Sequence, residues 1–198
     1  MRRSGKSALL ELTRQELLDR GVDRKNIIFI NFESLRYEAL RDYKALYAEI
    51  IKIAGQTEGR IYVLLDEIQE VNTWEQVINS LRVDLDCDIY VTGSNAKLLS
   101  GELATLLAGR YVEIQVYPLD FEEYLAFAKL SKQEQFANFL RFGGLPGIHQ
   151  LKWDEDRVMQ YLHDIYNSVL LKDVIARNRI RDTALLESIV LYLMDNIG

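Results

Sequence analysis

The chain has 198 residues, of which 48% are hydrophobic and 27% are charged, and its formal net charge is -6. This composition is ordinary for a soluble globular protein, and the negative charge argues against a protein whose whole surface binds nucleic acid. No apolar run approaches the ~20 residues that a membrane-spanning helix needs, and a single cysteine, Cys87, excludes an internal disulfide.

The first motif stands at the N-terminus, where the sequence reads Arg-Arg-Ser-Gly-Lys-Ser over residues 2–7 and a helical pattern follows. It matches the second half of the phosphate-loop pattern GxxxxGK[ST]. In that pattern Gly5 lets backbone amides turn toward phosphate oxygens, Lys6 reaches the β- and γ-phosphates, and the Ser7 hydroxyl binds Mg²⁺. Together with Ser4, these residues predict a site for Mg·ATP.

The other half of this pattern is missing from the chain. Its first glycine would lie one residue before Met1, and the strand that normally feeds the loop is absent. A truncated chain, a start codon assigned too late and a degenerate gene product would each give this result, and the sequence leaves the three open.

Short β-branched runs then alternate with longer helical patterns, which predicts a parallel α/β sheet with right-handed crossovers. The expected strands are Ile27–Phe32, Ile61–Leu65, Ile89–Thr92 and Tyr111–Val116, and the expected helices are Ser7–Asp19, Tyr43–Ala54, Trp74–Leu85 and Leu98–Leu107. The strand Ile61–Leu65 is apolar throughout, as expected for a strand buried on both faces.

Two acidic residues, Asp66 and Glu67, follow that apolar strand directly. In a parallel sheet ligands bind at the carboxyl edge, so both carboxylates are expected beside the phosphate loop. Asp66 is the candidate Mg²⁺ ligand, and Glu67 is the candidate general base that activates the attacking water. This pair is interpreted as a Walker B element.

After Pro118 the chain reads as helices without a further strand: Phe121–Leu130, Gln133–Phe142, Glu155–Ile175 and Thr183–Asn196. The turn Gly143–Gly147 breaks the pattern, because glycine and proline disrupt both periodicities. We place a domain boundary there, with an ATPase core in residues 1–142 and an all-helical segment in residues 143–198. The apolar last helix stops at the chain end, so a further C-terminal domain is expected.

A basic run near the junction of the last two of these helices, Lys172–Arg181, holds four basic residues and one acid. Such a run can contact DNA phosphates or form a solvated helix face, and the acidity of the whole chain favours the second interpretation.

The stretches RRSGKS, IIFINFE, YVLLDEIQEV, IYVTGSNAKLLS, LAGRYVEIQVYPLDFEEYL and FGGLPGI resemble those of bacterial and archaeal AAA+ ATPases of the ATP-binding, DUF4143 type. The resemblance spans essentially the whole chain, although the C-terminal domain usual in that family is absent. It implies a P-loop ATPase core of AAA+ type that lacks its first strand. It also implies a cytoplasmic enzyme that uses ATP and Mg²⁺ to change the conformation of an unidentified protein or DNA partner.

The resemblance also gives expected roles to residues that pattern alone does not reveal. Ser94 and Asn95 fall where a strand end senses the γ-phosphate, although Gly, Ser and Asn are also common in simple turns. Arg110 stands where AAA+ proteins place an arginine finger that reaches a neighbouring subunit, which implies a homo-oligomer. A structural ion pair is the alternative for Arg110. Glu33, after the strand next to Walker B, is expected to influence Glu67.

Two other functions stay open from the sequence: a nucleotide-responsive switch with little hydrolysis, and a DNA-binding protein with a vestigial ATPase core.

The AAA+ sheet order implied by the resemblance makes the missing first strand central. Its two neighbours in the sheet are the strands expected at Ile89–Thr92 and Tyr111–Val116. Their backbone groups would then lack hydrogen-bond partners, which would cost about 1–3 kcal/mol of stability for each buried group. We therefore expect these strands to pair directly, to borrow a strand or to accept another segment. We also expect weak or no ATP binding by a chain whose phosphate loop lacks this support.

Overall fold

A computed structural model of the protein describes residues 3–93, 107, 109–128, 132–151, 154–169, 175 and 182–196. The chain divides into two compact units, Arg3–Tyr117 and Pro118–Gly198.

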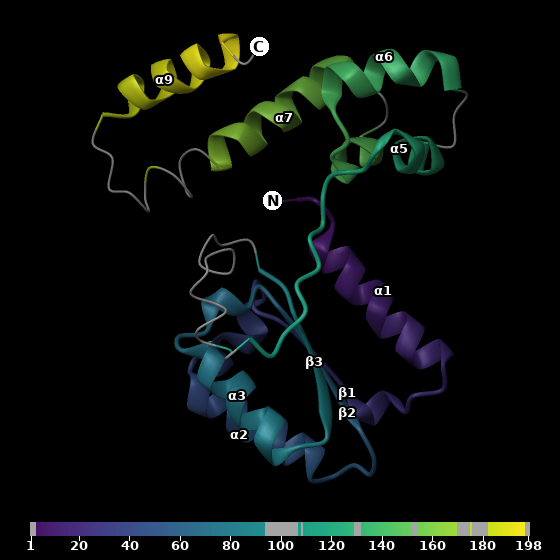
Figure 1. Ribbon diagram of the computed structural model, residues 1–198, viewed down its shortest axis with the longest axis vertical. Coiled ribbons are helices and arrows are strands. Elements are labelled where there is room, and N and C mark those ends of the chain that lie inside the picture. Colours follow the sequence, from purple (N-terminus) through teal and green to yellow (C-terminus); the bar gives the residue numbers. More distant parts are fainter. Residues whose placement is uncertain are drawn as a thin grey trace. The chain divides into compact units, whose positions relative to one another are not determined.

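The first unit is built on a three-stranded parallel sheet in the order β1-β2-β3. The strands are β1 (Ile27–Asn31), β2 (Ile61–Asp66) and β3 (Cys87–Val91). One face of the sheet carries helix α1, and the other carries α2 and α3 (Figure 1). These helices are α1 (Lys6–Asp19), α2 (Tyr43–Ala54) and α3 (Trp74–Asp84), and short 3-10 turns are η1 (Arg24–Asn26), η2 (Leu35–Arg41) and η3 (Ile68–Glu70).

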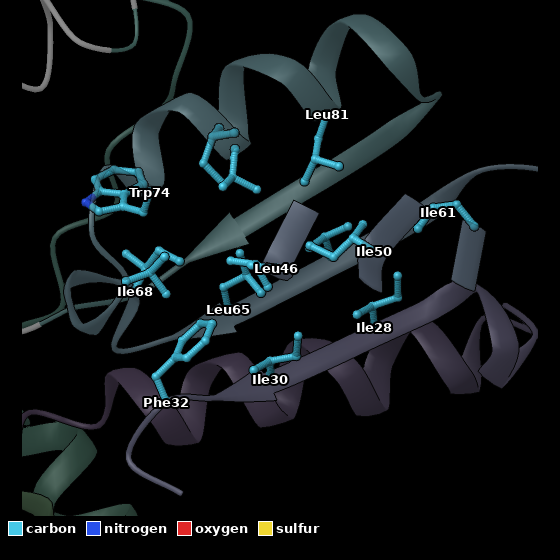
Figure 2. Close-up of a cluster of buried hydrophobic side chains, with 14 of the residues drawn as sticks. Ile28, Ile30, Phe32, Leu46, Ile50, Ile61, Leu65, Ile68, Trp74 and Leu81 are labelled. Atoms are coloured by element: carbon cyan, nitrogen blue, oxygen red, sulfur yellow. The ribbon is translucent and has the colours of Figure 1, made fainter. Parts of the chain in front are cut away.

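The central strand β2 is buried on both faces, which explains its unbroken apolar sequence. On one face Leu65 packs with Leu46 of α2 and Leu81 of α3 in the main hydrophobic cluster (Figure 2). On the other face Leu64 packs with Leu10 of α1. The sheet therefore forms the middle layer of three, with its strand ends held between the helices.

Helix α2 shows why the local sequence folds as it does. The side chain of Asp42 caps the helix by accepting a hydrogen bond from the backbone N–H of Ala45 at 3.0 Å. Leu46, Ile50 and Ala54 follow at intervals of four residues and are all buried. The helix begins and ends at the residues predicted from this spacing.

The second unit contains helices with a core of their own. They are α5 (Phe121–Ala128), α6 (Lys132–Phe142), the 3-10 turn η4 (Pro146–Gln150), α7 (Glu155–Val169) and α9 (Thr183–Asp195). The turn before η4 is tightly packed, because a Cβ atom on Gly144 would lie 1.9 Å from the carbonyl oxygen of Leu119. Only glycine fits at this position. Phe142 and Leu145, on either side of the turn, belong to one hydrophobic cluster.

The predicted fold class, a parallel α/β core followed by an all-helical segment, is confirmed. The division of the chain into domains after Phe142 stays a prediction. The predicted helix Leu98–Leu107, apart from Leu107, and most of the basic run Lys172–Arg181 lie outside the described residues.

The predicted strand Tyr111–Val116 is wrong. Residues 110–116 form no strand with any described segment, and the side chains of Val112 and Ile114 are 88% and 73% exposed. Alternating β-branched residues indicate that a segment suits a sheet, but a strand also needs a neighbour for its backbone groups. Among the described residues no strand pairs with the outer edge of β3 to extend the sheet toward this segment.

Candidate functional site

Asp66 ends β2 at the carboxyl edge of the sheet, and its side chain is fully buried. Side chains from three different segments donate hydrogen bonds to its carboxylate. Ser7 Oγ donates to Oδ1 at 3.1 Å, Asn31 Nδ2 donates to Oδ2 at 3.0 Å, and the hydroxyl of Thr92 also donates to Oδ1. These donors give the buried carboxylate the hydrogen bonds that it would otherwise make with water.

The N-terminus of α1 forms the second part of the site. Gly5 precedes the helix with φ 100°, a left-handed conformation that glycine adopts without strain, and Lys6 is the first helical residue. Ser4 is buried, with 3% of its surface exposed. The helix thus directs its backbone N–H groups and its partial positive charge to this edge, which is the arrangement that binds anions such as phosphate.

Glu67 follows Asp66 in a left-handed backbone conformation, with φ 54° and ψ 48°. Its backbone N–H donates to Thr92 Oγ1 at 3.3 Å, and its carboxylate Oε2 accepts a hydrogen bond from Gln69 Nε2. The next residue, Ile68, donates its backbone N–H to the carbonyl oxygen of Thr92 at 3.0 Å. The sharp turn therefore fixes Glu67 beside Asp66 through contacts with the end of β3.

The structure brings Ser7 and Asp66 into contact across 59 residues of sequence, and it places Gly5, Lys6 and Glu67 on elements adjoining this pair. Ser94 and Asn95 lie outside the described residues. Arg110 is exposed, its backbone N–H donates to Leu107 O at 3.1 Å, and no ion pair joins its side chain to the described part of the chain.

Sequence reasoning missed three residues of this site: Asn31, Thr92 and Gln69. Asn31 lies opposite Asp66 in the parallel register of β1 and β2, and its Oδ1 accepts the backbone N–H of Glu33 at 2.8 Å. The Glu33 side chain is exposed, so in this structure it is Asn31 that contacts Walker B. The sequence does contain a signal for Asn31. Asn31 is the last residue of β1, the strand that pairs with the Asp66 strand, so alignment of the two strands places it opposite Asp66.

The oxygen atoms of Asp66 and Ser7 fit a magnesium ion by their chemistry. Mg²⁺ prefers hard oxygen ligands, keeps several waters, and in nucleotide sites uses only one or two carboxylates together with substrate phosphates. The 3.1 Å contact between these two side chains places both oxygens where one cation can reach them.

A sequence model described as "AAA domain" matches residues 1–125 of the 198-residue chain. The chain belongs to the AAA domain family. Its GKS loop and its Asp66–Glu67 strand end thus lie inside the matched AAA domain, and membership in this family indicates nucleotide binding and ATPase activity in general.

Relatives of this AAA domain occur in bacteria and archaea. An uncharacterized protein of Haemophilus influenzae is 41% identical over 203 residues, covering 100% of this chain and 50% of the relative. An uncharacterized protein of Methanocaldococcus jannaschii, MJ1544, is 30% identical over 190 residues, covering 87% of this chain and 42% of the relative. The chain therefore spans half or less of the length of these relatives, and no solved structure matches it.

Among the described residues, no helix is both long enough and apolar enough to cross a membrane.

Proposed function

We propose that this AAA domain binds Mg·ATP and hydrolyses it, and that turnover changes the conformation of a partner. The observation that carries the proposal is the contact between Ser7 and the fully buried Asp66, at the carboxyl edge of a parallel sheet. A hydroxyl at a helix N-terminus beside a strand-end carboxylate is the arrangement in which P-loop enzymes hold a magnesium nucleotide.

Each group has a separate task in the proposed reaction. Lys6 and the amides after Gly5 would bind the phosphates, while Ser7 and Asp66 would hold Mg²⁺, whose positive charge would neutralise the charge that develops on the phosphates. Glu67 takes a proton from the attacking water as general base. These tasks separate ground-state binding from chemistry, because Lys6 contacts the phosphates throughout and Glu67 acts only on the water.

Further roles are proposed from the resemblance to the DUF4143-type AAA+ ATPases. Ser94 and Asn95 sense the γ-phosphate, and Arg110 reaches the nucleotide of a neighbouring subunit in a homo-oligomer. The partner is another protein or DNA, and the protein works in the cytoplasm. The exposed side chain of Arg110, without an ion pair to the described residues, favours the finger over the ion-pair alternative.

The test compares Lys6→Ala and Glu67→Gln in the intact protein that contains this chain. We expect Lys6→Ala to abolish Mg·ATP binding measured by calorimetry. Glu67→Gln should leave binding intact and stop phosphate release, because an amide cannot take the proton of the water.

Three results would contradict the proposal. Equal loss of binding in both variants would remove the separation of roles. Tight binding without phosphate release by the unsubstituted protein would favour the nucleotide switch, and salt-dependent duplex binding that survives Lys6→Ala would favour the vestigial ATPase core.

A further inference from the structure

Gln69 is the fourth residue of the Asp-Glu-Ile-Gln stretch at which β2 ends and η3 forms, and its side chain folds back onto Glu67. Its Nε2 atom donates a hydrogen bond to Oε2 of the Glu67 carboxylate. Its Oε1 atom is buried, and no described residue donates a hydrogen bond to it. The carboxamide thus holds the carboxylate with one end and offers a buried acceptor with the other.

The turn that produces this contact is fixed by the backbone. Glu67 has a left-handed conformation, which is strained for a non-glycine residue and persists only where surrounding contacts enforce it. Those contacts are the hydrogen bonds from the N–H groups of Glu67 and Ile68 to Thr92, together with the complete burial of the Ile68 side chain. With Ile68 pointing into the core, Gln69 lies on the same side of the turn as Glu67.

The buried Oε1 atom of Gln69 needs a hydrogen-bond donor, which no described residue supplies. Leaving a buried acceptor without a hydrogen bond destabilises the folded state, and buried groups of this kind are usually satisfied by an ordered water. Because the other end of the same carboxamide binds the Glu67 carboxylate, a water at Oε1 lies beside the proposed general base.

We propose that Gln69 is a positioning residue for hydrolysis: its Nε2–H group orients the Glu67 carboxylate, and its Oε1 atom accepts a hydrogen bond from the attacking water. The proposal rests on the proposed ATPase function. In the step, the water oxygen bonds to the γ-phosphorus, the bond from that phosphorus to the β–γ bridging oxygen breaks, and Glu67 takes the proton of the water. Gln69 exchanges no proton and acts only on the orientation of Glu67 and the water.

The first experiment separates binding from turnover in the intact protein. Gln69→Leu keeps the approximate size of the side chain but removes both polar atoms, and Gln69→Glu replaces the donor by a repelling carboxylate. We expect each to lower kcat by about 10–100-fold, a part of the ~10²–10⁴-fold that a positioned base contributes, without weakening Mg·ATP binding. Gln76→Leu, at an exposed glutamine of α3, is the matched control and should retain full kcat.

The second experiment measures the contact itself without relying on turnover. The side-chain NH₂ signals of Gln69 in an NMR spectrum are identified by their loss in Gln69→Leu. We expect Glu67→Gln to shift these signals, since it removes the charged acceptor, while Glu70→Gln, at an exposed neighbouring acid, leaves them in place. Unmoved signals in Glu67→Gln, or unchanged kcat in both Gln69 variants, would overturn the proposal.

The two experiments also distinguish this inference from the proposed function. Absence of phosphate release by the unsubstituted protein refutes the ATPase function and, with it, the role in hydrolysis. The NMR comparison then still decides whether Gln69 orients the Glu67 carboxylate.

Discussion

The carboxylate of Asp66 is fully buried, so its hydrogen bonds come from neighbouring side chains and its burial is tolerated because of them. Asn31 is the donor that the strand next to β2 provides, at 3.0 Å. The side-chain oxygen of Asn31, Oδ1, accepts a hydrogen bond from the backbone N–H of Glu33, so both ends of the side-chain amide have a partner that fixes its orientation. A hydrogen bond to a charged group contributes about 1.5–3 kcal/mol, more than one between neutral groups.

We predict that Asn31→Ala lowers the free energy of unfolding by about 1–3 kcal/mol and weakens Mg·ATP binding, because Asp66 loses a partner and its fixed orientation. Chemical unfolding and calorimetric titration measure the two effects. The control is Asn26→Ala at the opposite end of the sheet, where Asn26 Nδ2 donates to the carbonyl oxygens of Glu58 and Arg60 at 2.7 and 3.0 Å. If both variants bind nucleotide equally well, Asn31 serves stability only.

At the scale of elements, β3 stands at the edge of the described sheet. Asp86 O accepts the N–H of Ile61, and Thr92 N–H donates to Leu65 O, so the even-numbered residues of this stretch bond to β2. Because backbone groups alternate in direction along a strand, the N–H groups of Ile89 and Val91 point away from β2. No described strand meets them.

We predict a corresponding alternation in hydrogen exchange along β3. The amides of Ile89 and Val91 should exchange much faster than those of Asp88 and Tyr90 in this chain, since only the latter bond to β2. NMR-detected exchange measures this directly. Equal protection at all four amides would mean that another strand covers the edge of β3, as in the predicted borrowing of a strand.

At the scale of the whole molecule, the hydrophobic residues form separate cores in the two units. Ile148 and Val158 belong to the hydrophobic cluster of the second unit. The buried hydrophobic residues that pack on the two faces of the sheet belong to the first unit. His149 lies beside the second core, with its ring centroid 4.4 Å from that of Tyr124 and its Nε2 atom buried without a described partner. Burial lowers the pKa of His149 from its ordinary value of 6.5.

We predict that acid destabilises the second unit through His149. The unfolded chain binds a proton near the ordinary pKa, and the folded chain binds it only at lower pH, so the unfolded state holds more protons in between. The contribution to stability is therefore present above the ordinary pKa and is lost as pH falls below it toward the lowered pKa of the folded chain. Hydrogen exchange of the Ile148 amide, which donates to Leu145 O, follows this loss.

The matched variants for this prediction are His149→Phe, which removes the titrating ring, and His163→Gln at an exposed histidine. The first should abolish the loss of protection in acid, and the second should retain it. Loss that persists unchanged in His149→Phe would assign the effect to other groups.

The sequence by itself determined the class of fold, most of its elements and the main candidate residues. Helix α2 was predicted to the residue because its cap and its apolar spacing are local features. Ser7 and Asp66 could be assigned because each lies in a motif whose chemistry requires its residue type. Membership in the AAA domain family supports the general class of nucleotide-binding ATPase, while the roles of the individual residues stay predictions.

Only the tertiary structure decided which neighbours these residues have. Asn31 and Thr92 stand far from Asp66 in sequence, and they meet it through the register of parallel strands, which composition and spacing do not encode. Gln69 contacts Glu67 because a left-handed turn reverses the chain at Glu67. The segment 111–116 has the sequence of a strand but lacks a partner among the described residues, since strand formation is a property of two segments and not of one.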